Sequence, residues 1–182
     1  MTILRDTTNA KHREVEALPL IQCLMQGQAT VPIYVAYLYE LKQIYKNIEE
    51  LAKHHGILQG LEGIERYELI SKDLLELDKT HSHNLMPSTE KYIAHLHELA
   101  NDENRKHLLM AHVYVRHMGD LYGGKLMARV IPGNGYAYQF DDRPRLIKAF
   151  NDKLSIDLGD EANLAFDYFI NIFSELWDNY GK

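Results

Sequence analysis

Apolar residues recur at spacings of three and four along almost the whole chain, and we find no convincing run of alternating apolar and polar residues. In residues 30–56, for example, Ile33, Tyr37, Leu41 and Ile44 fall on one face of a helix with 3.6 residues per turn. A strand would instead show a period of two. The pattern therefore predicts an all-α fold.

Proline, glycine and capping residues divide this pattern into separate helices. Pro19 is expected to stop the first helix, Thr30 to cap the second and Asp160 to cap the last. A capping pattern at residues 87–90 predicts another start, and "PGNG" at residues 132–135 predicts another end. The expected helices cover residues 3–17, 30–56, 63–80, 87–100, 105–130, 143–156 and 160–179.

Length and composition narrow the class of protein. The 182 residues, of which 46% are apolar and 25% charged, suit one globular domain spanning residues 1–182. A net charge of −6 argues against nucleic acid as the main partner, because phosphate binding needs a concentrated basic face. Cys23 is the only cysteine, which excludes an intramolecular disulfide and a cysteine-held metal cluster. With no signal peptide or membrane-length apolar run, the sequence predicts a soluble, cytoplasmic protein.

Ten histidines raise the question of a metal site. A di-iron carboxylate bundle needs Glu-x-x-His on two helices, and no glutamate of the chain is followed by histidine at that spacing. The zinc protease pattern His-Glu-x-x-His is also absent. Two histidine pairs have members two residues apart, which places them on different helix faces. We therefore expect surface positions for His81, His83, His95 and His97, and a helix end for His54 and His55.

His12 differs from the other histidines because Glu16 follows it one helical turn later. An acid at i+4 can accept the second imidazole N–H and so fix the ring, as carboxylates do for many metal-ligating histidines. The same spacing is common on exposed helices. Spacing alone therefore nominates His12 as a ligand but leaves a surface role favoured.

The stretch "RHMGDLYGGKLM", residues 116–127, places three glycines inside an expected helix. Each glycine costs roughly 0.5–1 kcal/mol relative to alanine there. Gly119 and Gly123 form a small-x-x-x-small pattern that fits either a tight helix crossing or the close approach of a planar ligand. With Gly124 they are expected to kink the helix. Asp120 between them favours the ligand, because it adds a polar group to an accessible backbone surface.

These features together resemble the haem oxygenase family. "GDLYGGK" at residues 119–125 is similar to the family's distal-helix signature Gly-Asp-Leu-Ser-Gly-Gly-Gln, with Tyr122 and Lys125 as departures. "TTNAKHREVE" at residues 7–16 resembles its proximal helix. Further matches, in the same order, are "LKQIYKNIEEL" (41–51), "YVRHMGD" (114–120) and "AFDYFINIFSELW" (165–177). The resemblance extends from about Leu4 to Trp177 and implies a haem held between a proximal helix and a kinked distal helix.

The resemblance also implies roles for individual residues. His12 would ligate the haem iron with support from Glu16, and Asp120 would order a water beside the ring. The glycines would let the ring approach the distal helix. The implied catalytic residues are Asp120, Arg116, Tyr45 and Tyr114, and the implied haem-binding residues are His12, Glu16, Arg5, Gly119, Gly123, Gly124, Lys148, Lys153, Phe166 and Phe173. Asn9 and Asn151 stand where the family usually has basic residues, so Lys148 and Lys153 are substitutes near Asn151.

The implied reaction opens haem at a meso carbon, by family norm the α carbon, to biliverdin, carbon monoxide and ferrous iron. Haem would be substrate and cofactor, dioxygen the oxidant, and the electron donor a ferredoxin or another small reductase, with a bilin reductase as a downstream partner. A basic patch could dock an acidic donor, although a solvated surface explains the same residues. Its members would be Lys42, Lys46, Arg143, Arg145 and Lys148.

Two rival functions stay open at this point. A haem carrier or sensor could use the same bundle without turnover. An enzyme of the thiamin-degrading group would need a nucleophilic cysteine, and Cys23, expected in a loop or short helix after Pro19, is a poor candidate. A purely structural bundle would leave the ordered matches without an explanation.

Overall fold

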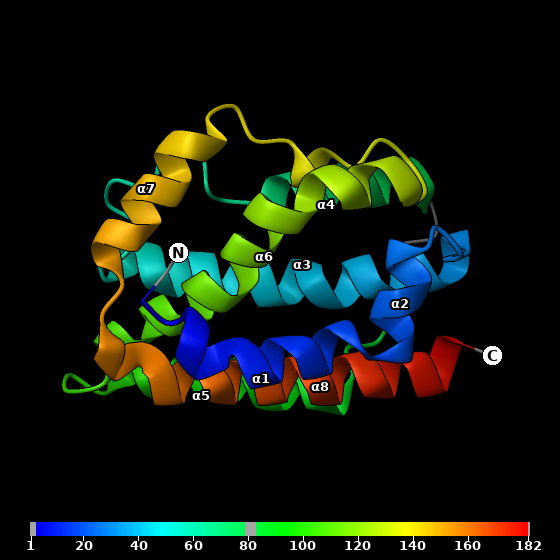
Figure 1. The fold of residues 1–182 in the computed structure, drawn as a ribbon. Helices are drawn as coiled ribbons and strands as arrows, with labels where there is room; N and C mark the ends of the chain where they lie inside the picture. The colour runs from blue at the N-terminus through cyan, green and yellow to red at the C-terminus, as the bar shows by residue number, and fades with distance from the viewer. Residues whose placement is uncertain (1–2, 79–82, 182) are drawn as a thin grey trace.

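The chain, seen in a computed structural model that describes residues 3–78 and 83–181, folds into helices, and the described residues contain no strand (Figure 1). This confirms the predicted all-α class. The helices are α1 (Arg5–Glu16), α2 (Pro19–Met25), α3 (Val31–His54), α4 (Tyr67–Leu77), α5 (Pro87–Asn101), α6 (Leu109–Val130), α7 (Arg143–Lys153) and α8 (Gly159–Tyr180). Three short 3-10 turns join them: η1 (Lys106–Leu108), η2 (Tyr136–Tyr138) and η3 (Ile156–Leu158).

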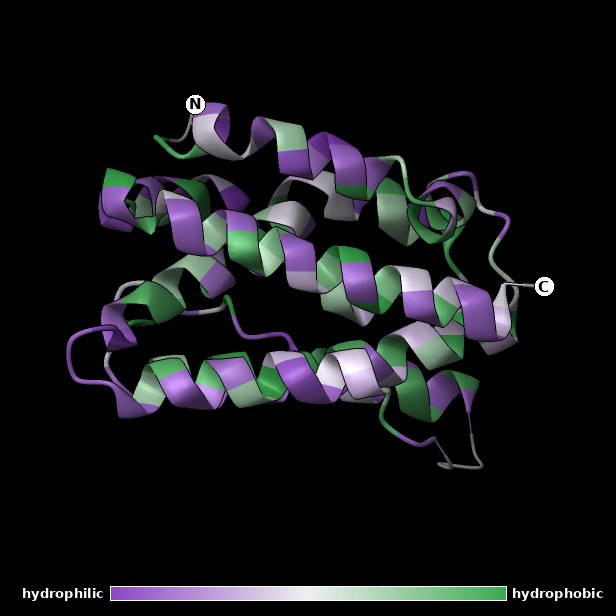
Figure 2. Cartoon of the chain, turned by 90° about the horizontal axis from the view of Figure 1, so that it is seen from below, coloured by the Kyte–Doolittle hydropathy of each residue, from purple (hydrophilic) through white to green (hydrophobic). Residues whose placement is uncertain are grey.

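Helices α3 and α8 are the two elements on which the others assemble. Helix α3 packs against α4, α5 and α6, while α8 packs against α1, α2, α5 and α6. The long helices carry both hydrophilic and hydrophobic residues, and their apolar sides form one core (Figure 2). Tyr37 of α3 meets Phe173 of α8 there, with ring centroids 5.8 Å apart. Truncating a buried phenylalanine such as Phe173 to alanine typically costs about 3–5 kcal/mol.

The burial of helix α6 changes along its length, from buried at its start to partly exposed at its glycines. Residues 109–115 are buried all around the helix, so this half shows no single apolar stripe. Further along, Gly119, Tyr122 and Gly123 are exposed, and the ribbon of α6 changes direction in this region (Figure 1). The chain thus carries one helix from the centre of the core to an open surface, and the glycine motif marks the transition.

Several helix starts differ from the prediction. Pro19 does stop the first helix, but it also begins α2, because a proline suits the first turn of a helix. Cys23 accordingly lies in a short helix. Asp160 is not the cap of α8: Leu158 holds that position, and Asp160 lies in the first turn. The residue before α5 is Met86, with Pro87 at the first position, so the serine and threonine of the predicted cap lie inside the helix.

Helix α4 starts later than the sequence predicted because another helix caps it. Glu49 of α3 accepts the backbone N–H groups of Arg66 and Tyr67, at 2.5 and 3.1 Å. A carboxylate that satisfies the free N–H groups of a first turn stabilises a helix start at that point. The predicted last residues of this helix, 79 and 80, lie outside the described residues.

Candidate functional site

Three side chains predicted to share a site meet between α3 and α6. Arg116 and Asp120 are one turn apart on α6, and Arg116 Nη2 donates to Asp120 Oδ1 at 2.6 Å. Arg116 Nε donates to the hydroxyl oxygen of Tyr45, 2.8 Å away, and the Tyr45 hydroxyl donates to Asp120 Oδ2. The three groups form a closed ring of hydrogen bonds that connects residues 75 positions apart in the chain.

Burial and charge set the protonation of this ring. Burial and the Asp120 carboxylate raise the pKa of Tyr45 well above its usual 10, against the opposing effect of Arg116, so Tyr45 stays a neutral donor. Burial alone would lower the pKa of Arg116, but Asp120 and Tyr45 raise it well above its usual value. Asp120, only 5% exposed, is an acceptor between two donors. Removing one member of such a buried ion pair typically costs about 3–5 kcal/mol.

The glycines beside Asp120 serve two different purposes. A Cβ atom added to Gly119 or Gly123 would meet nothing within 4 Å, so both leave an open backbone face one turn apart on α6. A Cβ on Gly124 would lie 3.1 Å from the ring of Tyr138. Gly124 therefore permits a close contact with the η2 turn, away from the open face. Tyr122 is 60% exposed and does not pack behind the bend.

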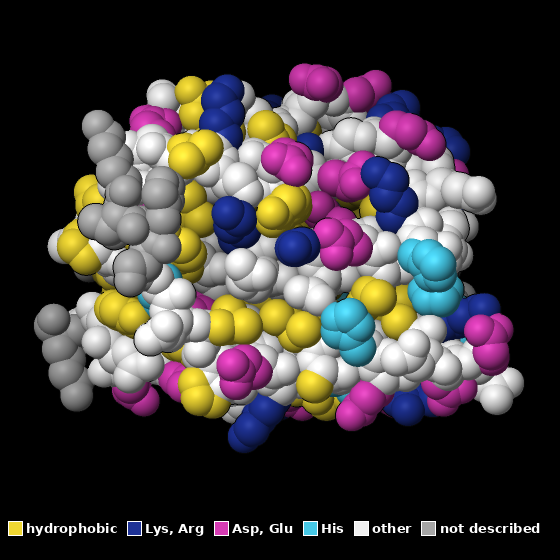
Figure 3. Space-filling view, turned by 180° about the vertical axis from the view of Figure 1, so that it is seen from behind, with side chains coloured by type: hydrophobic (Ala, Val, Ile, Leu, Met, Phe, Trp, Pro, Cys, Tyr) yellow, Lys and Arg dark blue, Asp and Glu magenta, His cyan; other side chains and the backbone are white. Residues whose placement is uncertain are grey.

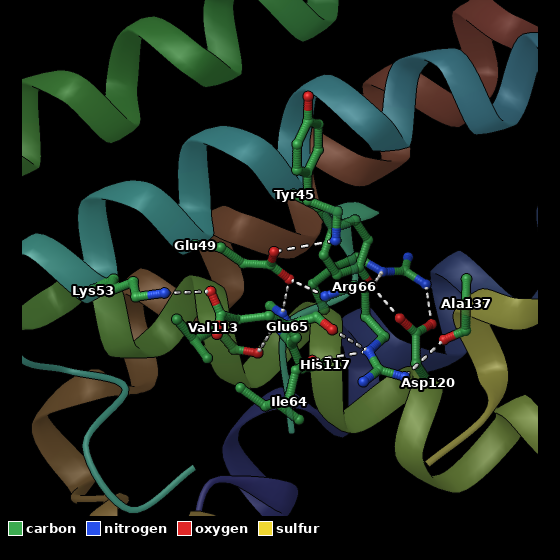
Figure 4. Close-up of polar contacts among 12 residues, drawn as sticks. Tyr45, Glu49, Lys53, Ile64, Glu65, Arg66, Val113, His117, Asp120 and Ala137 are labelled. Atoms are coloured by element: carbon green, nitrogen blue, oxygen red, sulfur yellow. Dashed lines mark hydrogen bonds and ion pairs between the residues drawn. The ribbon is translucent and has the colours of Figure 1, made fainter. Parts of the chain in front are cut away.

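A second polar cluster, made of His117 and Glu49 and not predicted from the sequence, packs against the ring of Tyr45 (Figure 4). His117 of α6 is fully buried, and its ring lies nearly perpendicular to the Tyr45 ring with centroids 4.9 Å apart. His117 Nδ1 contacts the Val113 carbonyl at 3.1 Å, and Nε2 contacts Glu49 Oε1 at 2.9 Å. Since a carbonyl oxygen only accepts, His117 Nδ1 donates its hydrogen to Val113. A second hydrogen lies between His117 Nε2 and Glu49 Oε1. This cluster fixes α3, α4 and α6 together.

The third cluster corrects the prediction for His95, which is buried rather than at the surface. His95 Nε2 and His112 Nε2 contact the same oxygen of Glu161, at 2.5 and 2.9 Å, and Tyr92 contacts His112 Nδ1 at 2.8 Å. Two ligands of one tetrahedral zinc would be about 3.3 Å apart. These shorter spacings are hydrogen-bond distances, so the contacts satisfy the buried polar atoms without a cation.

The other histidines that were predicted at the surface or at a helix end agree with the prediction in part. His97 is exposed as predicted, and His54 and His55 lie at the end of α3 as predicted. His83 is mostly covered and contacts Glu40 Oε1 at 2.7 Å, so its predicted surface position is wrong. His81 lies outside the described residues.

The proximal candidate His12 lies in a much more open setting. Its side chain is 52% exposed, and its Nδ1 is 3.6 Å from Glu16 Oε2, longer than a hydrogen bond. Its ring lies nearly perpendicular to that of Phe166 of α8, with centroids 6.0 Å apart. Among the described residues, Nε2 of His12 has no hydrogen-bond partner, so it is available to a ligand. Lys11 ties this part of α1 to Asp167 of α8 at 2.6 Å.

The remaining predicted residues lie in varied surroundings. Tyr114 is buried on α6, two residues before Arg116, which directs it to a different face of the helix. Phe173 lies in the core beside Tyr37. Arg5 is exposed two turns before His12. Lys148 is exposed and paired with Asp152 at 2.9 Å, and Lys153 is partly exposed.

The sequence of this chain is similar to those of known heme oxygenases. The family model described as "Heme oxygenase" matches residues 1–175. The heme oxygenase of Rhodella violacea is 30% identical over 207 residues, covering 98% of this chain and 87% of the relative. Heme oxygenase 1 of Nostoc is 28% identical, covering 98% and 86%.

Solved structures agree on the fold. Heme oxygenase-1 from the cyanobacterium Synechocystis, in complex with heme, superposes with a TM-score of 0.85 at 22% identity, covering 97% of this chain and 91% of that one. Heme oxygenase from Leptospira interrogans gives a TM-score of 0.82 at 24% identity, covering 95% and 97%.

Proposed function

Because this chain is an enzyme that belongs to the haem oxygenase family, we propose that it opens the haem ring at a meso carbon, using dioxygen and external electrons, to yield biliverdin, carbon monoxide and ferrous iron. The observation that carries this proposal is the closed Arg116–Asp120–Tyr45 ring, which lies directly beside two glycines whose backbone face is open. A planar substrate needs such a flat face, and oxygen chemistry on it needs an ordered polar group.

The residues present fit haem on both sides of the proposed site. His12 offers an unpartnered imidazole nitrogen beside the apolar ring of Phe166, and an imidazole is a common axial ligand of haem iron. Gly119 and Gly123 offer a surface without side chains on the distal helix. Arg5, Lys148 and Lys153 would meet the propionates, since all three are charged and reachable from solvent. Bound haem supplies the iron that activates dioxygen.

Asp120 has the central polar role in this proposal. As a carboxylate it cannot donate a proton itself, but each of its oxygens has a second acceptor site besides those taken by Arg116 and Tyr45. A water held there would be oriented by the hydrogen bond that it donates to the carboxylate, and it would deliver protons beside the ring. Arg116 and Tyr45 position the carboxylate. Tyr114 is proposed to extend the network, and Gly124 to contribute to the haem face through the shape of α6.

The electron donor would be a ferredoxin or another small reductase, and a bilin reductase would take the product. Figure 3 shows acidic and basic side chains interspersed on the face opposite to that of Figure 1. Of the five basic residues expected in a docking patch, Arg143 is occupied by hydrogen bonds to the backbone. None of the helices in residues 3–78 and 83–181 is long and apolar enough to cross a membrane.

A single-turnover experiment tests the proposal against a haem carrier on the same fold. Haemin is added, the Soret band is recorded, and ascorbate is then supplied in air, with products separated by chromatography. The proposal requires a bilin as product. Persistent ferric or oxygenated haem, with no bilin, would instead establish a binding protein.

A further inference from the structure

Arg143, the first residue of α7, reaches back to the middle of α6. Its Nη1 donates to the Leu121 carbonyl at 2.5 Å and lies 3.4 Å from the Asp120 carbonyl. Its Nη2 donates to the Tyr138 carbonyl at 2.5 Å. One guanidinium therefore joins α7, the η2 turn and the distal helix.

The two α6 carbonyls contacted by Arg143 are inside the helix, where Gly124 and Lys125 would be their usual hydrogen-bond donors. A side chain that enters the backbone ladder is a known cause of helix bending. The contact falls within the glycine motif, at the point where α6 leaves the core. Arg143 thus supplies a fixed donor to a helix that three glycines have weakened.

Two aromatic side chains pack on this side of α6, one against the guanidinium and one against the helix backbone. Phe140 lies between two arginines, 4.9 Å from the Arg143 guanidinium and 3.9 Å from that of Arg66. The Tyr138 ring packs where a Cβ of residue 124 would otherwise stand. The η2 turn and the start of α7 therefore brace one side of α6, while Gly119 and Gly123 leave another side open.

We infer that Arg143 is a positioning residue for the proposed haem reaction. It fixes the bend of α6, which sets how closely the Gly119–Gly123 face approaches the ring and where the Asp120 carboxylate is held. Asp120 is thereby fixed twice, through its side chain by Arg116 and through its main chain by Arg143. The inference rests on the proposed function for its effect on the reaction, but its effect on α6 exists without haem.

The test compares Arg143→Met and Arg143→Lys with the control Arg129→Met, which removes an exposed arginine from the last turn of the same helix. Hydrogen–deuterium exchange of the haem-free proteins is measured first. In Arg143→Met, the amides of residues 119–125 should exchange faster than in the wild type, while the control should match the wild type. In Arg143→Lys, the exchange rate of these amides should lie between those of Arg143→Met and the wild type, because one ammonium group replaces the several donors of the guanidinium.

The second readout uses haem and ascorbate, so that no protein donor is involved. Arg143→Met should bind haemin with nearly wild-type affinity but form bilin on the order of tenfold more slowly and as more than one isomer, because small displacements at a reaction centre are costly. Wild-type exchange in residues 119–125 together with a wild-type isomer ratio in both variants would overturn the inference. Failure of the wild type to form bilin would refute the proposed function alone, since the exchange result does not depend on it.

Discussion

The two helices proposed to flank the haem differ in how firmly the chain itself holds their polar groups. On α6, Asp120 is 5% exposed and bound by two side chains. On α1, His12 is 52% exposed, and its nearest charged partner, Glu16, lies 3.6 Å away. On the proposed distal side the polar groups already hold one another in the haem-free chain, whereas on the proposed proximal side His12 offers an imidazole nitrogen without a partner. Under the proposed function, preorganisation would thus be greatest where proton delivery must be controlled, and least where a metal–ligand bond would supply the order.

The largest effect is expected from the distal side. Asp120→Ala should retain haem binding through His12 but lower bilin formation roughly 100-fold or more, because the ordered water loses its acceptor. Single-turnover assays measure the loss. Since the alanine variant leaves Arg116 buried without its partner, Asp120→Asn is needed as a variant of the same shape. Wild-type bilin yields from both variants would contradict the assignment.

Two substitutions can separate the roles of Gly123 and Gly124 within the glycine motif. Gly123→Leu enters open space, so thermal stability should hold or rise by up to about 1 kcal/mol while haem affinity falls about tenfold or more. Gly124→Ala should instead gain less stability than an alanine usually brings to a helix, or lose some, because its Cβ would stand 3.1 Å from the ring of the buried Tyr138. Haemin titration and thermal melting give the two quantities. Equal effects of both substitutions would show that the glycines share one role.

The buried cluster of His95, His112 and Glu161, which joins α5, α6 and α8, should control the stability of the fold in acid. Burial would raise the pKa of Glu161, but hydrogen bonds and charge from His112 and His95 outweigh it and lower this pKa from 4.5 to about 2. A lowered carboxyl pKa contributes stability above pH 4.5, here about 3 kcal/mol, which is lost as the pH falls toward 2. Urea unfolding between pH 7 and 2.5 measures this loss.

Glu161→Gln is the matching variant for that experiment. It should be less stable than the wild type at pH 7 and should lose less stability on acidification. Glu68→Gln, which changes an exposed carboxylate on α4, serves as the control and should follow the wild type. An unchanged acid profile for Glu161→Gln would place the titrating group elsewhere.

The smallest effect is expected on the proximal side. Glu16→Gln should change haem affinity by less than about tenfold, below the usual range for a residue that supports a metal ligand, because Glu16 is exposed and not within hydrogen-bond distance of His12. Haemin titration monitored at the Soret band gives the affinity. His12→Ala should abolish the normal spectrum, and an equal loss in Glu16→Gln would show that the proximal side is also fixed by the chain.

Several parts of the fold and site follow from local sequence. Spacings of three and four predicted the long helix α3, and the break at residues 101–104 and the end of α6 at Val130 were confirmed, because these signals depend on neighbouring residues. The first half of α6 shows no such spacing, because it is buried on all sides. The approach of Tyr45 to Asp120 came from the family resemblance and not from spacing. The burial of His95 was missed, since two residues of separation says only that faces differ, not which face meets another helix.

The sequence by itself determined an all-α chain, the i, i+4 pair of His12 and Glu16, and a helix weakened by glycines around Asp120. Tertiary structure decided what these local features meet. Only the packing of α3 against α6 closes the ring at Tyr45, and only the path of the chain through η2 into α7 brings Arg143 to the bend. Local periodicity fixes the direction of a side chain around its own helix. The position of a partner distant in the sequence depends on how all the helices pack together.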